Sequence, residues 1–183
     1  MVVCGMDECG RGALAGPLVA CAIVLKAQYS ILRLKDSKQL SIKQRNELYK
    51  QIINRAEVVR VEFISARQIN NRGMWWANKE IFRKLIRSIR ADKYIVDGNL
   101  KIKRATSMVK ADTKVPEVMA ASIVAKVTRD KFMKELHLKY PKYGWQTNVG
   151  YGTDHHIRAI SEHGSIHYHR SVFVTTALRN GGG

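Results

Sequence analysis

Runs of apolar residues, separated by glycines and polar segments, predict a chain in which short strands alternate with amphipathic helices. Val2–Met6 and Pro17–Leu25 are two apolar runs divided by a glycine-rich stretch, so we expect two neighbouring strands joined by a turn. Apolar runs at Val58–Ile64 and Lys93–Val96 predict two further strands. The sequence therefore predicts a sheet that includes these four strands.

Capping signatures and apolar spacing predict the helices. A Ser-x-x-Gln signature that starts at Ser41 opens a helix as far as about Ala56. The same signature at Ser65 opens a longer helical stretch, which Gly73 interrupts. A further long helix begins at Pro116, because proline suits the first helical turn.

The last part of the chain, from about residue 140, is predicted to be a small segment of helix and loop. Proline and glycine mark a loop as far as Gly152, after which Asp154 caps a short helix through Ile160. No repeat, low-complexity tract or Ser/Pro-rich linker marks a boundary, so we expect a single domain over residues 1–183. Strands that alternate with helices predict the α/β class, with a mixed sheet flanked by helices and this small helical C-terminal part.

The charge balance points to a polyanionic partner. The chain has 32 Lys and Arg residues against 15 Asp and Glu residues, which leaves a net charge of +17 with His neutral. Such a charge attracts nucleic acid by counterion release and long-range steering, and an anionic membrane surface is the second expectation. A hydrophobic content of 45% excludes wholesale disorder.

Cysteine usage and hydropathy indicate a cytoplasmic protein. The three cysteines form neither a C-x-x-C pair nor an even disulfide set, which favours a reducing compartment. The longest apolar run, Pro17–Leu25, is about half of a bilayer span. The N-terminus lacks a leader pattern, so we expect neither a signal peptide nor membrane insertion.

Acidic residues stand where predicted elements end or begin. Asp7 and Glu8 follow the first apolar run, and Asp97 follows the fourth. Asp112 precedes the long helix, whose positive end favours an ionised carboxylate. Because neighbouring strand residues point to opposite faces, Asp7 and Glu8 can approach one metal only if the backbone turns there. Each acid alone could be a solvated strand end or a cap, but together they suit Mg²⁺ or Mn²⁺ with phosphate oxygens.

Seven short motifs follow one another between Gly5 and Phe173, which is nearly the whole chain. They are Gly5–Gly12, Gly16–Pro17, Asp36–Lys38, Val96–Gly98, Lys110–Asp112, Ala120–Asp130 and Gly150–Thr153. In this order they resemble ribonuclease HII, the type 2 ribonucleases H. The resemblance implies a ribonuclease H-like mixed sheet flanked by helices and the activity of a metal-dependent endonuclease.

The resemblance further implies that Asp7, Glu8, Asp97 and Asp112 are catalytic and bind two Mg²⁺ or Mn²⁺ ions. Two such ions, about 3.5–4 Å apart, activate a water for in-line attack on phosphorus and stabilise the departing 3′ oxygen. Cleavage is then expected 5′ of a ribonucleotide, in RNA/DNA hybrids and in duplex DNA with embedded ribonucleotides. The products carry 5′-phosphate and 3′-hydroxyl ends, and the tasks are ribonucleotide excision and RNA primer removal.

A set of substrate-binding residues is implied by the same resemblance. Glycines let the backbone approach a sugar closely, so that main-chain groups can bond a 2′-hydroxyl that DNA lacks. A tyrosine between two glycines adds a hydroxyl and a stacking face, and a lysine contacts phosphate. Each of these residues alone would more often be a solvated or loop residue. The set is Gly10, Arg11, Gly12, Lys38, Tyr151, His169 and Arg170.

The C-terminal motif departs from the family's pattern at one position. The family's His-Arg-x-Ser-Phe reads His169–Phe173 here, with Val172 at the serine position.

Because the chain begins at the catalytic strand, we expect no N-terminal substrate-binding domain of the related type 3 enzymes, and Gly10–Gly12 also favours type 2. Five histidines near the end lack the spacing and the thiolates of a zinc site.

The expected partners are an RNA/DNA hybrid and ribonucleotide-containing duplex DNA, with a monomer as the default state and recruitment by a sliding clamp left open. Two other functions stay open at this stage. One is a non-catalytic nucleic-acid-binding protein in which the acids are structural, against which four intact acids argue. The other is an acid-cluster nuclease such as a resolvase or an integrase core, against which Gly10–Gly12 and Tyr151 argue.

Overall fold

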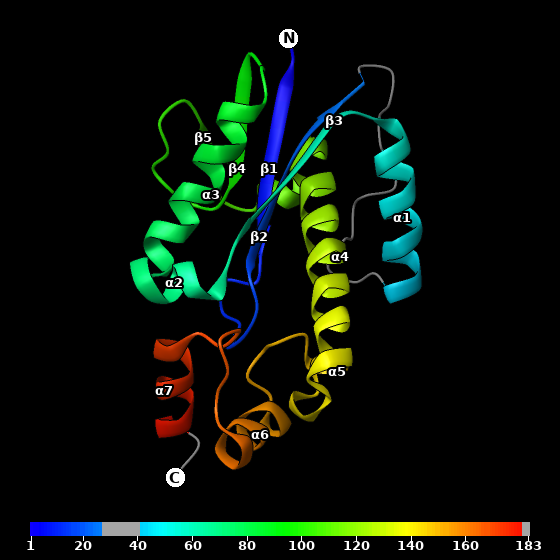
Figure 1. Ribbon diagram of the computed structural model, residues 1–183. Helices are drawn as coiled ribbons and strands as arrows, with labels where there is room; N and C mark the ends of the chain where they lie inside the picture. The colour runs from blue at the N-terminus through cyan, green and yellow to red at the C-terminus, as the bar shows by residue number, and fades with distance from the viewer. Residues whose placement is uncertain (27–40, 181–183) are drawn as a thin grey trace. The chain divides into compact units, whose positions relative to one another are not determined.

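The computed structural model describes residues 1–26 and 41–180 and contains a mixed five-stranded sheet (Figure 1). The strand order is β3-β2-β1-β4-β5. β1 pairs antiparallel with β2 and parallel with β4, and β4 pairs parallel with β5. The strands are β1 (Val3–Cys9), β2 (Leu18–Leu25), β3 (Ala56–Ile64), β4 (Lys93–Asp97) and β5 (Thr106–Met108).

The central strand β1 is covered closely by helix α4 (Pro116–Lys139). Residues Cys4–Met6 are buried. A Cβ atom on Gly5 would lie 2.3 Å from backbone atoms of Glu117 and Val118. Because any side chain would collide there, glycine allows the first turn of α4 to pack directly against the strand that carries the predicted acids.

Helices α1 (Ile42–Arg55), α3 (Met74–Ser88) and α4 flank the sheet (Figure 1). The predicted capping box opens α1, where the Ser41 hydroxyl accepts the Gln44 N–H and the Gln44 side chain accepts the Ser41 N–H. Ile52 of α1 is buried in a cluster with residues of β2 and α4, among them Cys21, Ile23, Ile123 and Val127.

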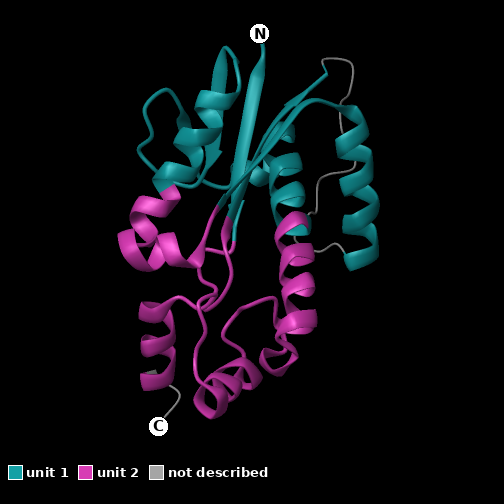
Figure 2. Ribbon diagram, in the orientation of Figure 1, with its two compact units in different colours: residues 1–9, 19–63, 79–127 teal, residues 10–18, 64–78, 128–183 magenta. Residues whose placement is uncertain are grey.

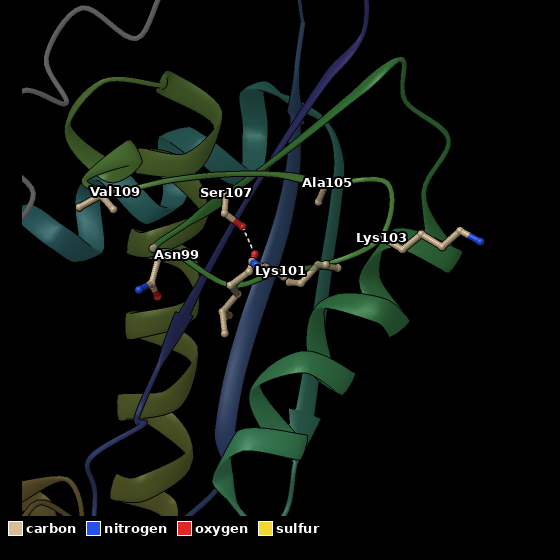
Figure 3. Close-up of a pocket in the computed structure, with 9 residues that line it drawn as sticks. Asn99, Lys101, Lys103, Ala105, Ser107 and Val109 are labelled. Carbon is tan, nitrogen blue, oxygen red and sulfur yellow. Dashed lines mark hydrogen bonds between the residues drawn. The ribbon is translucent and has the colours of Figure 1, made fainter.

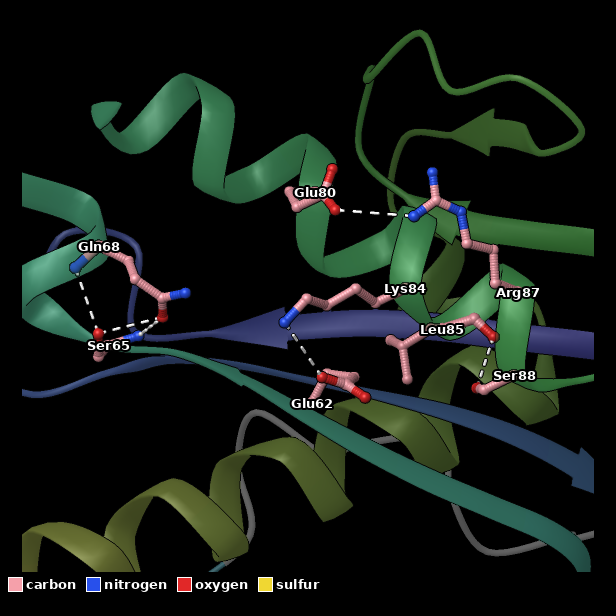
Figure 4. Close-up of polar contacts among 8 residues, drawn as sticks. All are labelled: Glu62, Ser65, Gln68, Glu80, Lys84, Leu85, Arg87 and Ser88. Carbon is pink, nitrogen blue, oxygen red and sulfur yellow. Dashed lines mark hydrogen bonds and ion pairs between the residues drawn. The ribbon is translucent and has the colours of Figure 1, made fainter. Parts of the chain in front are cut away.

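Polar contacts surround the exposed side of α3 (Figure 4). The Lys84 Nζ atom lies 3.7 Å from Glu62 Oε2 of β3, and Arg87 Nη1 lies 3.9 Å from Glu80 Oε1. Exposed pairs of this kind contribute about 0–1 kcal/mol. The fully buried apolar face of α3 therefore holds this helix in place more than its ion pairs do.

The chain forms two compact units, each assembled from segments that are far apart in the sequence (Figure 2). The first unit comprises residues 1–9, 19–63 and 79–127 and holds nearly all of the sheet. The second comprises residues 10–18, 64–78 and 128–183. The expected organisation as a single domain stays a prediction.

The second unit is helical around an aromatic core. Its core gathers Leu14, Met133, Tyr143, Trp145 and Ile160. Both amide atoms of Asn70 bind the C-terminal segment, because Nδ2 donates to the His169 carbonyl at 3.0 Å and Oδ1 accepts the Ser171 N–H at 2.9 Å. Besides the first turn of α3 and the second half of α4, the helices are α2 (Ala66–Arg72), the 3-10 helix Pro141–Tyr143, α5 (Trp145–Asn148), α6 (Asp154–His163) and α7 (Ser171–Asn180).

The predicted α/β class is confirmed, with a mixed sheet, flanking helices and a helical C-terminal part. Several predicted boundaries differ from those of the structure. The first strand continues to Cys9, so Asp7 and Glu8 lie inside β1 and not after it. Thr153, not Asp154, caps α6, because its hydroxyl lies at the N-cap and accepts a helix N–H.

Sequence patterns did not predict β5 or α7. β5 has three residues, too few to show a strand period. α7 begins with Ser171 and Val172 and contains two threonines, and residues of these types weaken a helical signal. Across the described residues, no helix is long and apolar enough to cross a membrane.

Candidate functional site

Two of the predicted acids occupy equivalent positions of paired parallel strands. Met6 of β1 pairs with Val96 of β4, and the next residues of the two strands are Asp7 and Asp97. Adjacent strands lie about 4.8 Å apart, and equivalent positions of parallel strands face the same side of the sheet. The parallel pairing therefore brings together two carboxylates from distant parts of the chain.

All four predicted carboxylates line one pocket of the first unit, with a volume of about 410 Å³. Three polar side chains of helices share this pocket, namely Arg45 of α1 and Ser122 and Lys126 of α4. The two α4 residues are four positions apart and hence lie on one face of the helix. The pocket is lined by Asp7, Glu8, Cys9, Arg45, Asp97, Asp112, Ser122, Ile123 and Lys126.

β1 stays regular through its two acids. Glu8 pairs with Ala20 and Cys9 with Val19, so the strand does not leave the sheet between Asp7 and Glu8. The described strand therefore does not make the turn that would direct both side chains to one side, although both carboxylates line the pocket.

The pocket is electrostatically unfavourable for Asp7, which is 9% exposed. Burial raises the pKa of Asp7 well above its usual value, and the charges of Glu8, Asp97 and Asp112 raise it further. The Glu8 N–H donates a hydrogen bond of 2.7 Å to Asp7 Oδ1 and opposes part of this rise in pKa. An adjacent cation would favour the ionised form of all four groups.

Asp97 also organises the loop that carries Asp112. Its Oδ1 atom accepts the N–H of Ala111 at 2.7 Å and that of Asp112 at 3.5 Å. Asp112 lies in a short 3-10 helix, Ala111–Thr113, and is 4% exposed. One oxygen of Asp97 thus holds the neighbouring acid in the pocket wall, which leaves its other oxygen for a ligand.

The donor chemistry of the pocket fits Mg²⁺ or Mn²⁺, since hard divalent cations take carboxylate oxygens. The positions of the carboxylate side chains, in contrast, do not converge on one point. Within the described residues, no group of three or more His, Cys, Asp or Glu side chains is arranged so that it could hold a metal ion. The four carboxylates thus share a pocket, and binding an ion would require their side chains to turn toward a common point.

The loop between β4 and β5 forms a second hollow of the first unit, with a volume of about 630 Å³ (Figure 3). The loop begins directly after Asp97, and Ser107 Oγ closes it by donating a hydrogen bond to the Leu100 carbonyl. Lys101 and Lys103 belong to the wall of this hollow, and Lys103 extends outward from the loop. The loop therefore carries positive charge.

The predicted substrate-binding turn, Gly10–Gly12, belongs to the second unit and is held from inside by Arg170. Arg170 is fully buried, and its Nη1 atom donates to the carbonyls of Gly10 at 2.7 Å and Arg11 at 2.9 Å. Its Nε and Nη2 atoms donate to the Gly16 carbonyl at 3.1 and 2.9 Å. These hydrogen bonds go to backbone carbonyls, and the Arg170 Cζ atom lies 5.6 Å from the centre of the Phe173 ring. The assignment of Arg170 to direct substrate contact stays a prediction.

His169 and Tyr151 are linked through His156 in the interior of the second unit. His156 Nδ1 lies 2.8 Å from the Tyr151 carbonyl, and His156 Nε2 lies 3.0 Å from Trp145 Nε1 and 3.2 Å from His169 Nε2. The Ile166 N–H donates to His169 Nδ1 at 2.9 Å. These partners fit two neutral rings, with the His156 proton on Nδ1 and the His169 proton on Nε2. His169 is 2% exposed and supports the Tyr151 loop through this chain of contacts.

The structure therefore places the predicted residues in two groups, one in each unit. The carboxylates share the pocket of the first unit, whereas the turn, Tyr151, His169 and Arg170 belong to the second. Lys38 lies outside the described residues. Sequence reasoning gave no role to Ser122 and Lys126, although two polar residues four positions apart in an apolar helix segment are a recognisable signal.

A mixed sheet with carboxylates at equivalent positions of paired strands is the arrangement of a ribonuclease H-like nuclease. A family model described as "Ribonuclease HII" matches residues 4–176. The chain is 40% identical to Ribonuclease HII of Burkholderia thailandensis over 178 residues, which are 94% of this chain and 83% of that protein. The chain therefore belongs to the ribonuclease HII family.

Solved structures support the fold. The ribonuclease H2 of Pyrococcus horikoshii OT3 superposes with a TM-score of 0.82 at 29% identity, covering 98% of both chains. The RNase HII in a PCNA:RNase HII complex from Archaeoglobus fulgidus superposes with a TM-score of 0.81 at 28% identity, covering 93% of this chain and 94% of that one. The predicted ribonuclease H-like fold is confirmed, and as a family member the chain is a metal-dependent nuclease that hydrolyses the RNA of RNA/DNA hybrids.

Proposed function

We propose that this enzyme cuts the phosphodiester 5′ of a ribonucleotide, both in RNA/DNA hybrids and in duplex DNA with embedded ribonucleotides. The cut leaves 5′-phosphate and 3′-hydroxyl ends. The observation that carries this proposal is the pocket that Asp7 and Asp97, from paired parallel strands, line together with Glu8 and Asp112.

The four carboxylates are the residues that hold divalent cations in this proposal. Two Mg²⁺ or Mn²⁺ ions, when bound, supply an activated water and neutralise charge on the departing 3′ oxygen. Asp97 has a second task, because its Oδ1 atom keeps Asp112 in the pocket wall through the Ala111 and Asp112 N–H groups. Lys126 and Arg45 line the same pocket and supply positive charge for a phosphate oxygen.

Recognition of the ribose is assigned to the second unit. Gly10 follows Cys9 directly, so the turn continues from the strand that carries Asp7 and Glu8. Gly12 is exposed, and a Cβ atom there would meet nothing within 4 Å, so this stretch of backbone is open to a sugar. Tyr151 supplies a hydroxyl and a ring face, whereas Arg170 and His169 support these elements from the interior. The expected phosphate contact of Lys38 is part of the same proposal.

The cellular role follows from the substrate. Removal of embedded ribonucleotides and of RNA primers places the enzyme in DNA repair and replication. A cytoplasmic location and a monomeric state are further parts of the proposal. The structure of one relative is that of a complex with PCNA, which supports a sliding clamp as a partner of this chain. The net charge of +17 supports binding to the duplex backbone.

One assay tests the proposal directly. The protein is incubated with a duplex that contains a single ribonucleotide, with an RNA/DNA hybrid and with an all-DNA duplex, each in Mg²⁺, in Mn²⁺ and in EDTA. Cleavage of the first two with either metal, and of none in EDTA, is the expected result. Cleavage of the all-DNA duplex would favour a resolvase-type nuclease, and binding without cleavage would favour a non-catalytic protein.

A further inference from the structure

A second buried arginine, Arg129 of α4, joins two segments of the second unit. It is fully buried, and its three guanidinium nitrogens donate to backbone carbonyls. Nε binds the carbonyl of Pro17 at 3.0 Å, Nη2 that of Ala15 at 2.9 Å, and Nη1 that of Val149 at 2.8 Å. One rigid, planar group thus fixes the segment after the Gly10–Gly12 turn and the loop before Tyr151 in a single geometry.

Gly10 lies directly on the Arg129 side chain. A Cβ atom built on Gly10 would lie 2.1 Å from Arg129 Nε and 2.6 Å from its Cδ. Gly10 also has a φ angle of +95°, which an L side chain rarely adopts. The first glycine of the turn is therefore required by the arginine beneath it, whereas Gly12 faces open space.

The loop on the other side of Arg129 is strained. Val149 is β-branched and has φ 43° and ψ 34°, in the left-handed region that such residues avoid. Backbone strain of this kind persists only where surrounding contacts hold it. Arg129 supplies one such contact by binding the Val149 carbonyl.

The strained loop also pairs with the turn segment and presents Tyr151. The Gly150 carbonyl accepts the N–H groups of Leu14 at 2.8 Å and Ala15 at 3.1 Å. The Arg129 Cζ atom lies 5.2 Å from the centre of the Tyr151 ring, within the range of a cation–π contact. The guanidinium thus touches both the backbone that carries Tyr151 and its ring.

We propose that Arg129 is the positioning residue for ribose recognition, because it holds the Gly10–Gly12 turn and Tyr151 in one fixed relation. This inference rests on the proposed function, in which these two elements read the 2′-hydroxyl. Arg129 itself is buried and acts through them. Its contribution is the geometry of its hydrogen bonds. A lysine at this position would contribute the same charge to duplex binding.

The test compares Arg129→Lys with Arg158→Lys, a matched change at an exposed arginine of α6. Lysine keeps the charge but cannot reach three carbonyls from one plane. We expect kcat/KM on the single-ribonucleotide duplex to fall about 10- to 100-fold for Arg129→Lys, since misplacement by about 1 Å costs on this order. Affinity for the all-DNA duplex should stay within about twofold, because the phosphate contribution is unchanged. Arg158→Lys should match the wild type in both.

A double-mutant cycle with Tyr151→Phe separates positioning from general destabilisation. If Arg129 acts through Tyr151, the doubly substituted enzyme loses clearly less activity than the product of the two single losses. Fully multiplicative losses would overturn the proposal. Arg129→Gln, which keeps two N–H donors without burying a charge, replaces the lysine variant if the latter does not fold.

Amide hydrogen exchange gives a readout that does not depend on the proposed activity. Exchange should accelerate in residues 10–17 and 148–152 together in the Arg129 variant, and in neither segment of the Arg158 variant. If the wild type fails to cut at ribonucleotides, the proposed function fails while this measurement still decides whether Arg129 couples the two segments. Unchanged exchange in both segments would refute the coupling.

Discussion

The Ala111 N–H donates a hydrogen bond of 2.7 Å to Asp97 Oδ1, so the strand acid holds the loop that carries Asp112. This contact separates two roles of Asp97. Asp97→Asn keeps the accepting oxygen and loses the charge, whereas Asp97→Ala loses both. We expect both variants to lose more than about 100-fold in kcat, because each removes a proposed metal ligand.

Only Asp97→Ala should also loosen the loop. Its free energy of unfolding should fall by about 1–3 kcal/mol, the cost of leaving a buried backbone N–H without its acceptor. Urea unfolding of the two variants and the wild type measures this difference. Full activity of Asp97→Asn would contradict the proposed site, and equal stability of the two variants would contradict the loop role.

The two glycines of the turn should respond differently to alanine. Gly10→Ala places a Cβ atom against Arg129 at a φ angle of +95°, and overpacking of this kind costs about 1–3 kcal/mol. Gly12→Ala meets nothing within 4 Å, so its stability should stay within about 0.5 kcal/mol of the wild type. Thermal unfolding measures both changes.

Gly12→Ala should lose activity although it keeps its stability. The Gly12→Ala variant stays folded, yet its methyl group projects from backbone assigned to the ribose, so cleavage of the single-ribonucleotide duplex should fall at least about 10-fold. A Gly12→Ala variant with unchanged kcat/KM would show that the sugar does not approach this residue.

The buried histidine pair predicts a loss of stability in acid. Burial lowers the pKa of His169 from 6.5 to about 4, with the neighbouring His156 acting in the same direction. Burial also lowers the pKa of His156, while its bond to the Tyr151 carbonyl acts in the opposite direction. Since the unfolded state binds these protons more readily, the stabilisation is present above pH 6.5 and is lost as the pH falls toward about 4.

His169→Phe removes one of these titrating groups and keeps a ring in the core. We expect the melting temperature of the wild type to exceed that of the variant at pH 7.5, and the gap to shrink as the pH falls to about 4.5. Thermal melts across this range, with His163→Phe at an exposed histidine as the control, measure the gap. A gap that stays constant over the whole range would refute the neutral pair.

The crowded carboxylates predict a conflict between stability and activity at Asp7. This group is buried beside three other acids, which disfavours its ionised form. Asp7→Asn removes one negative charge, so in EDTA the variant should melt at a higher temperature than the wild type. Added Mg²⁺ should raise the melting temperature of the wild type more than that of the variant, because binding favours the folded state.

Exposed Glu57→Gln in β3 serves as the control for the loss of one negative charge. It should leave both the melting temperature in EDTA and the response to Mg²⁺ unchanged. An equal Mg²⁺ response of Asp7→Asn and the wild type would contradict a role of Asp7 in metal binding.

Sequence patterns determined most of the secondary structure and the chemistry of the site. Capping boxes at Ser41 and Ser65 located two helices, because their signal is local to four residues. The ordered motifs identified Asp7, Glu8, Asp97 and Asp112 as candidate metal ligands. Apolar runs located the strands but misplaced the end of β1, since an acid inside a buried strand breaks the pattern that defines a strand.

Only the tertiary structure decided which of these residues act on one another. The parallel pairing of β1 with β4 brings Asp7 beside Asp97, and strand pairing depends on contacts between segments that no local pattern encodes. In the same way, burial makes Arg170 and His169 supports of the Gly10–Gly12 turn and the Tyr151 loop, and their direct contact with substrate stays a prediction. The sequence alone determined residue chemistry and local conformation, whereas burial and long-range pairing, which depend on the whole folded chain, decided how that chemistry is arranged.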